Sequence, residues 1–142
     1  MSLRIEITKT DAEVLATYAV MRQLHPDLPE SEYLRAVRTL QDELGFQLAS
    51  LMEDDCVVCA AGFRLCRSLG WGRYLYVDDL VTDESHRSKG AGKVMFEWLV
   101  DYARSHDCRE LRLDSAVYRH EAHRFYLRER MDIVCFHFRL SL

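Results

Sequence analysis

One stretch in the second half of the chain constrains the fold more than any other. Residues 74–81 have the composition of a strand, the loop Arg87-Ser88-Lys89-Gly90-Ala91-Gly92 follows, and residues 94–103 place apolar side chains at helical spacing. Gly90 and Gly92 lack a Cβ, so the backbone there can approach a ligand closely. The first N–H groups of the following helix have no intrahelical acceptor and carry the positive end of the helix dipole. The pattern therefore predicts a site for a phosphate-bearing ligand at a helix N-terminus.

The residues around this loop narrow the choice of ligand without naming it. Arg87 can make a bidentate contact to a phosphate, and Lys89 and Lys93 add positive charge. The dinucleotide fingerprint needs a third glycine that is missing here, and the Walker A loop needs Ser or Thr where Val94 follows Lys93. Both nucleotide motifs therefore fail. A close packing contact between strand and helix remains the alternative explanation of Gly90 and Gly92.

The remaining pattern predicts a mixed sheet protein of the α/β (α+β) class, in the order β-α-α-β-β-β-α-β-α-β. A capping box at Thr10 and Glu13 opens a helix that we expect to run to about Leu24, and Gly45 ends the next helix. The predicted strands are residues 3–8, 46–52, 56–66, 74–81, a short one around 111–113 and a final one at 133–140, and the predicted helices are residues 10–24, 33–44, 94–103 and 120–129.

Length and charge exclude several classes of function. The chain has 142 residues, which predicts one domain over residues 1–142, and its formal net charge of −4 argues against nucleic acid or an anionic membrane as a partner. No apolar run approaches the roughly 18 residues of a membrane span, and no secretory segment opens the sequence. We therefore expect a cytoplasmic protein with free thiols. Cys56 and Cys59 have the spacing of a metal or redox pair, but no second pair follows, so no metal is expected.

A second motif adds a family resemblance to this reasoning. Arg87-x-x-Gly90-x-Gly92 after a strand ending Asp79-Leu80-Val81-Thr82, together with Ala122-x-x-Phe125-Tyr126 on a later helix, resembles the GNAT N-acetyltransferases. The order of helices and strands is similar as well, so the resemblance covers almost the whole chain. It implies the acyl-CoA N-acyltransferase fold, with a central, mostly antiparallel sheet flanked by helices. It also implies acetyl-CoA as cosubstrate, an amine acceptor and a homodimer as one possible assembly.

The resemblance assigns roles residue by residue. The backbone of residues 80–82 would lie beside the pantetheine arm, the N–H groups of residues 88–93 would hold the pyrophosphate, and Tyr126 would protonate the departing thiolate. Arg119 stands where the family often has Asn, and Arg130-Met131 stands where it usually has Gly-Phe, so a left-handed helix end there would be strained by about 1 kcal/mol. The expected cofactor-binding residues are Leu80, Val81, Thr82, Arg87, Ser88, Lys89, Gly90, Ala91, Gly92, Lys93, Arg119, Phe125 and Tyr126.

Acetyl transfer to an amine also needs a proton acceptor, because roughly one lysine-like amine in a thousand is neutral at pH 7. Asp78 and Asp79 are the candidates, and strand alternation predicts that they point to opposite faces, so that one at most meets the acceptor. Asp79 is the preferred catalytic base, with solvated strand-end charges as the alternative. In the loop at 24–30, His25 and Asp27 are either contacts for the amine or turn residues.

Three functions follow from these patterns. The first is an acetyl-CoA-dependent N-acetyltransferase acting on a primary amine of a small molecule or peptide. The second is a non-enzymatic acyl-CoA-binding sensor on the same fold, because a fold does not by itself fix a function. The third, a phosphate-handling enzyme such as a kinase, is disfavoured by the missing Lys-Ser/Thr step after Gly92.

Overall fold

A five-stranded sheet forms the centre of the fold in the computed structural model, which describes residues 3–87 and 89–142. The strands lie in the order β1-β2-β3-β4-β5, and β1 to β4 pair antiparallel with their successive neighbours. The chain divides into two compact units, Met1–Arg112 and Leu113–Leu142. The assignment of all residues to one domain stays a prediction. The strands are β1 (Leu3–Ile7), β2 (Gln47–Glu53), β3 (Cys56–Ser68), β4 (Gly72–Thr82) and β5 (Glu110–Leu113).

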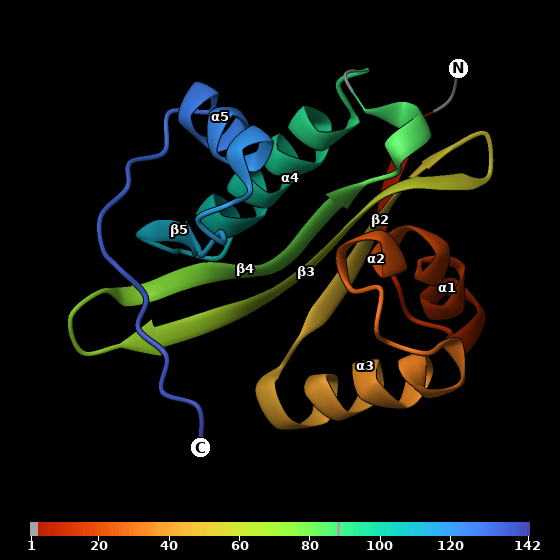
Figure 1. Cartoon of the computed structure of the whole chain (residues 1–142), viewed down its shortest axis with the longest axis horizontal. Helices are drawn as coiled ribbons and strands as arrows, with labels where there is room; N and C mark the ends of the chain where they lie inside the picture. Colours follow the sequence, from red (N-terminus) through yellow and green to blue (C-terminus); the bar gives the residue numbers. More distant parts are fainter. Residues whose placement is uncertain (1–2, 88) are drawn as a thin grey trace. The chain divides into compact units, whose positions relative to one another are not determined.

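Helices cover both faces of the sheet in the first unit. Figure 1 shows α1, α2 and α3 on one side of β3 and β4, with α4 on the other side. The mixed α/β architecture and the mostly antiparallel sheet expected from the sequence are therefore confirmed. The helices are α1 (Asp11–Ala16), α2 (Tyr18–Leu24), α3 (Glu30–Leu44), a 3-10 turn η1 (Glu84–His86), α4 (Ala91–Ser105) and, in the second unit, α5 (His120–Arg128).

Each face of the sheet has its own apolar packing. On the side of α1 to α3, buried helix residues pack against Ala60 of β3 and Val81 of β4. On the α4 side, the Phe63 ring meets Trp98 and Tyr102 edge to face, with ring centroids 5.9 and 5.1 Å apart. Burial on both faces fixes the central strands in place, including the end of β4 that leads to the predicted ligand loop.

The helix ends follow the local sequence signals closely. At α1, the Glu13 N–H donates to Thr10 Oγ1 at 3.1 Å, and the Thr10 N–H donates to Glu13 Oε1 at 2.8 Å, so the capping box is confirmed. The backbone N–H groups of Thr10 and Lys9 both donate to Glu13 Oε1 and lower the pKa of Glu13, because they stabilise its carboxylate. Gly45 follows α3 with φ of 67°, the left-handed cap that glycine adopts without strain.

The single helix predicted to reach Leu24 is wrong, because Thr17 divides it into α1 and α2. The Thr17 hydroxyl donates to the carbonyl of Val14 at 2.6 Å and lies 2.7 Å from the Tyr33 hydroxyl. A threonine that bonds back to a carbonyl of the preceding turn competes with the regular helical pattern.

The predicted final strand at 133–140 is also wrong. Residues 129–142 contain no helix or strand, although their apolar side chains alternate with polar ones. The side chains of Val134, Phe136 and Phe138 are exposed, and His137 pairs with Asp114 at 2.9 Å. A strand exists only through hydrogen bonds to a neighbour, and no strand pairs with this segment among the described residues.

The end of α5 contains the strained cap that the Arg130-Met131 pair implies. Arg130 has φ of 68°, its N–H donates to Leu127 O, and the Met131 N–H donates to Tyr126 O, each at 3.0 Å. This is a Schellman motif with arginine at the position that glycine normally fills.

Replacing Arg130 with Gly should therefore stabilise the protein. Glycine adopts the left-handed region without the steric penalty of a Cβ, so we expect Arg130→Gly to raise the free energy of unfolding by about 0.5–1 kcal/mol. Urea denaturation followed by far-UV circular dichroism measures the change. Arg128→Gly, two residues earlier at the last position of α5, is the matched control and should destabilise by up to about 1 kcal/mol. Equal losses in both variants would contradict the assigned strain.

Candidate active site

A bulge in β4 brings both candidate aspartates into one cavity. In the β3–β4 ladder Gly62 lies opposite Asp79 and Phe63 opposite Val77, so Asp78 is an extra residue with no partner position on β3. An extra residue interrupts the alternation of side chains along a strand. Asp78 and Asp79 accordingly line the same cavity. The expectation that they face opposite sides is wrong, since it assumed a regular strand.

Each of these two carboxylates has its own partner. The Arg64 guanidinium donates to both oxygens of Asp78, at 2.8 and 2.9 Å, and these hydrogen bonds raise the pKa of Arg64. Nε2 of His25 donates to Oδ1 of Asp79 at 2.5 Å. The Asp79 side chain is 14% exposed and that of His25 is 47% exposed. Asp79 is thus the shielded member of a carboxylate–imidazole pair that opens to solvent on the imidazole side.

Because Gly62 has no side chain, it leaves room for the Phe46 ring and the Asp79 carboxylate. A Cβ at Gly62 would lie 2.4 Å from Phe46 Cζ and 2.7 Å from Asp79 Oδ2. No side chain larger than hydrogen fits there unless Phe46 and Asp79 move. The sequence patterns did not single out Gly62, Phe46 or Arg64 as site residues, although a glycine inside a strand pattern is a known signal of a bulge or a close approach.

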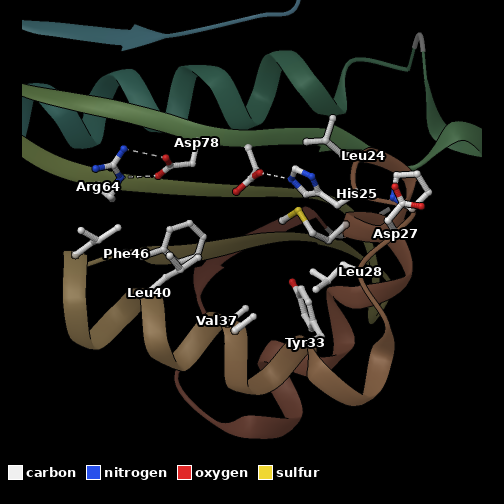
Figure 2. Close-up of a pocket in the computed structure, with 15 residues that line it drawn as sticks. Leu24, His25, Asp27, Leu28, Tyr33, Val37, Leu40, Phe46, Arg64 and Asp78 are labelled. Carbon is white, nitrogen blue, oxygen red and sulfur yellow. Dashed lines mark hydrogen bonds and ion pairs between the residues drawn. The ribbon is translucent and has the colours of Figure 1, made fainter. Parts of the chain in front are cut away.

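The cavity has a volume of about 740 Å³ and lies entirely within the first unit. Figure 2 shows Tyr33, Val37 and Leu40 of α3 on one side and Arg64 and Asp78 of the strands on the other. The loop between α2 and α3 closes one end of the cavity. Its two polar residues predicted as contacts for the amine, His25 and Asp27, both line the cavity. The lining residues are Met21, Leu24, His25, Pro26, Asp27, Leu28, Tyr33, Ala36, Val37, Leu40, Leu44, Phe46, Arg64, Asp78 and Asp79.

The backbone of residues 80–82 continues directly from Asp79 toward the predicted cofactor loop. On one side it pairs with β3, where Leu80 lies opposite Ala61. On the other side of β4, the four-residue strand β5 begins next to Arg73, whose carbonyl accepts a 2.8 Å bond from the Arg109 N–H. Four residues extend about 13 Å, so β5 accompanies only the first half of β4. With this length, β5 ends before it reaches residues 80–82 and leaves their second backbone edge uncovered.

The start of α4 has the geometry of an anion site. Gly90 precedes the helix with φ of 88°, a conformation that favours glycine, and Val94 donates the first helical bond to Gly90 O at 3.0 Å. The backbone N–H groups of Ala91, Gly92 and Lys93 therefore belong to the first helical turn. Ser88 lies outside the described residues.

Three cationic side chains lie near the start of α4, and two of them have partners within a few residues. Arg87 donates from Nε to the Thr82 carbonyl at 3.4 Å, while Lys93 pairs with Glu97 at 3.3 Å and Lys89 is exposed. Arg87 thereby connects the loop to the end of β4. The helix end itself therefore offers chiefly backbone N–H groups, with Arg87, Lys89 and Lys93 beside it.

A hydrogen-bonded carboxylate holds the segment between β4 and α4. Asp83 accepts bonds from Gln23 Nε2 at 2.7 Å and from the Ser85 hydroxyl, and it contacts His86 Nδ1 at 3.0 Å. These hydrogen bonds, led by that from Ser85, hold the pKa of Asp83 far below its usual range. The carboxylate remains charged at neutral pH and anchors this segment to α2.

The remaining predicted site residues belong to the second unit. Arg119 immediately precedes α5, and Phe125 and Tyr126 lie on it with ring centroids 5.5 Å apart. Burial raises the pKa of Tyr126, and the nearby charge of Arg119 offsets this in part. The Tyr126 hydroxyl is therefore protonated at neutral pH, as a proton donor must be.

Whether the described residues form a metal-binding cluster, a reactive cysteine pair or a membrane-spanning helix follows from their arrangement and burial. No group of three or more His, Cys, Asp or Glu side chains is arranged to hold a metal ion within residues 3–87 and 89–142. Cys56 is exposed, whereas burial raises the pKa of Cys59 to about 11. None of the helices in the described part of the chain combines the length and apolar character needed to cross a bilayer.

Solved structures with this fold include several acetyltransferases. A ribosomal-protein-alanine N-acetyltransferase from Brucella melitensis biovar Abortus 2308 superposes with a TM-score of 0.83 at 17% identity, covering all of both chains. Glucosamine-6-phosphate N-acetyltransferase from Arabidopsis thaliana gives a TM-score of 0.75 at 19% identity, covering 99% of each chain. At these identities the likeness establishes the fold alone.

Sequence comparison establishes the family. An uncharacterised N-acetyltransferase from Bacillus subtilis (strain 168), YhdJ, is 31% identical over 110 residues, which cover 78% of each chain. The model of the acetyltransferase (GNAT) family matches residues 14–131, from α1 to the end of α5. This span includes the β4 bulge, the α4 N-terminus and Tyr126. The chain belongs to the GNAT acetyltransferase family.

Proposed function

We propose that this protein transfers the acetyl group of acetyl-CoA directly to a primary amine. The observation that carries the proposal is the continuity of β4. The same strand supplies Asp79 to a cavity and then, from Leu80 to Thr82, an unpaired backbone edge leading toward the α4 N-terminus. An acceptor in the cavity and a thioester beside the strand would meet at Asp79. The family membership favours this reading over the non-enzymatic sensor.

The cofactor end uses hydrogen-bond donors of the backbone. The unpaired edge at residues 80–82 can bind the amides of a pantetheine arm as an added strand would. The first turn of α4 offers N–H groups and a positive dipole end to the pyrophosphate, with Arg87 and Lys89 nearby. The amides of the pantetheine arm and the pyrophosphate of acetyl-CoA would thus each meet a matching backbone segment of this chain.

At the acceptor end, the proton of the ammonium group must be removed before attack. Asp79 accepts it in this proposal, directly or through one water. The His25 bond engages Oδ1 of Asp79, so Oδ2 is the oxygen assigned to the amine. The neutral nitrogen then attacks the thioester carbon and forms the C–N bond, and its second proton leaves to water as the amide forms, which balances the proton that Tyr126 later regains from solvent. The C–S bond breaks, and Tyr126 supplies the proton that converts the departing thiolate to CoA thiol.

The acceptor's class stays open between a small molecule and a peptide terminus. The structural neighbours include one named for a ribosomal-protein alanine and one named for glucosamine 6-phosphate, so the fold serves both kinds of acceptor. The cytoplasmic location and the homodimer expected from the sequence also stay predictions.

The cofactor assignment is tested at Gly92. An aspartate in the first turn suits a helix dipole, so Gly92→Asp should fold normally, but its charge repels a pyrophosphate. We expect acetyl-CoA affinity to fall by at least about 100-fold. Calorimetric titration with acetyl-CoA measures this, and Gly92→Asn separates the added charge from the added bulk. An unchanged affinity in Gly92→Asp would refute the site, whereas normal binding by the wild type without CoA release from any amine would favour the sensor.

The proton acceptor is tested by Asp79→Asn. Loss of a general base typically lowers kcat by about 10²- to 10⁴-fold. The deficit should be largest at low pH, where nearly all of the amine is protonated, and should shrink as the pH approaches the amine's own pKa. Rates of CoA release across a pH series give the profile. Asp27→Asn, which removes another cavity carboxylate, is the control and should leave the profile's shape unchanged. Parallel profiles for wild type and Asp79→Asn would exclude Asp79 as the base.

The proton donor is tested by Tyr126→Phe. The variant should lose about 10- to 10⁴-fold in kcat while the KM for acetyl-CoA changes little, because a hydroxyl is removed and the ring is kept. Since burial raises the pKa of Tyr126 above its usual value near 10, the wild type should show no loss of rate from this group below about pH 10. Tyr118→Phe, an exposed tyrosine of the same unit, is the control. Full activity of Tyr126→Phe would assign proton delivery to solvent.

A further inference from the structure

The two walls of the cavity differ sharply in chemistry. On one side, α3 contributes the apolar side chains of Ala36, Val37, Leu40 and Leu44 and the ring of Tyr33, whose hydroxyl is hydrogen-bonded to Thr17. On the other side, Arg64, Asp78 and Asp79 form the charged wall. Figure 2 shows Arg64 and Asp78 on this side. A ligand that fits this cavity therefore needs one polar end and one apolar side.

The apolar wall still has surface to bury. Leu40 and Leu44 line the cavity and are nevertheless 37% and 51% exposed. Covering such side chains with a hydrocarbon removes apolar area from water on both partners. Each methylene buried in this way improves binding by about fourfold. The cavity volume of about 740 Å³ is within the range of pockets that enclose small organic ligands.

The charged wall selects the other end of the ligand. The charged wall carries a net charge of −1, and Asp27, on the loop that closes one end, brings these four groups of the cavity to −2. The cavity therefore stays negative even when His25 carries a proton. Arg64 is also already engaged by both oxygens of Asp78, so its paired fork is not presented to an anionic acceptor. The wall attracts an ammonium group and repels carboxylates and phosphates.

We propose that the acceptor is a small primary amine with an uncharged alkyl or aryl body, and that the cavity rejects acceptors bearing a carboxylate or phosphate. The amine points to Asp79, and the hydrocarbon lies against Leu40 and Leu44 of α3. This inference rests on the proposed acetyltransfer and names the substrate class for it.

Two acceptor series test the two walls. From ethylamine to hexylamine, kcat/KM should rise by at least about tenfold, because each added methylene finds apolar surface. Phenethylamine should exceed phenylalanine, which differs from it only by a carboxylate, by at least about tenfold. Rates are compared at equal concentrations of neutral amine, since the carboxylate alters the amine's pKa. Phenylalanine amide restores an uncharged scaffold and should recover most of the phenethylamine rate. A flat alkyl series, or phenylalanine equal to phenethylamine, overturns the proposal.

Matched variants connect each preference to its wall. Leu40→Asn should flatten the alkyl series, whereas Leu15→Asn on α1, outside the cavity and similarly exposed at 40%, should not. Asp78→Asn releases Arg64, so it should raise the ratio of phenylalanine to phenethylamine turnover by at least about tenfold. Because each result is a ratio within one protein, a loss of stability cancels. Identical series in Leu40→Asn and Leu15→Asn overturn the apolar contact.

A binding measurement separates this inference from the proposed function. Hexylamine, ethylamine and 6-aminohexanoate are titrated calorimetrically into the protein with CoA present. Preference for hexylamine without turnover of any amine would retain the ligand class of the cavity and reject acetyltransfer. Turnover that shows no preference among these three would retain acetyltransfer and reject the proposed acceptor class.

Discussion

The arrangement of the site depends on one irregularity, the extra residue at Asp78 in the β3–β4 ladder. A regular strand would send Asp78 and Asp79 to opposite faces, whereas the bulge lets both line one cavity. Gly62, opposite the bulge, leaves room for the Phe46 ring and the Asp79 carboxylate. Without this close approach, the carboxylate could not occupy its present place between the ring and His25.

The bulge also separates two functions along a single strand. Before it, β4 pairs with β3 on one side and is accompanied by β5 on the other; after it, residues 80–82 pair with β3 and lie beyond the length of β5. The cavity proposed for the acceptor and the backbone edge proposed for the cofactor are therefore adjacent. The packing of Phe63 against α4 and of Val81 against the helices on the other face holds this part of the sheet between two apolar layers.

The three carboxylates at and after the end of β4 have different hydrogen-bond partners. Arg64 neutralises Asp78, which leaves Asp79 as the carboxylate whose second oxygen is assigned to the acceptor, and His25 orients it. Asp83, a few residues later, is held as an anion by Ser85, Gln23 and His86 and anchors the segment before α4. The strand end thus carries three carboxylates that the surrounding groups place in three different situations.

Local signals alone determined much of this protein. The capping box at Thr10, the left-handed Gly45, the strained Arg130 and the glycine loop before α4 all follow from interactions within a few residues of the chain, so the sequence predicts them directly. The family motifs likewise lie in short contiguous stretches. The failures came from contacts between distant residues: Thr17 breaks a helix where its hydroxyl meets Tyr33, and the strand pattern at 133–140 finds no described partner. Likewise, the common face of Asp78 and Asp79 and their pairing with Arg64 and His25 depend on the register between strands, which only the folded chain fixes.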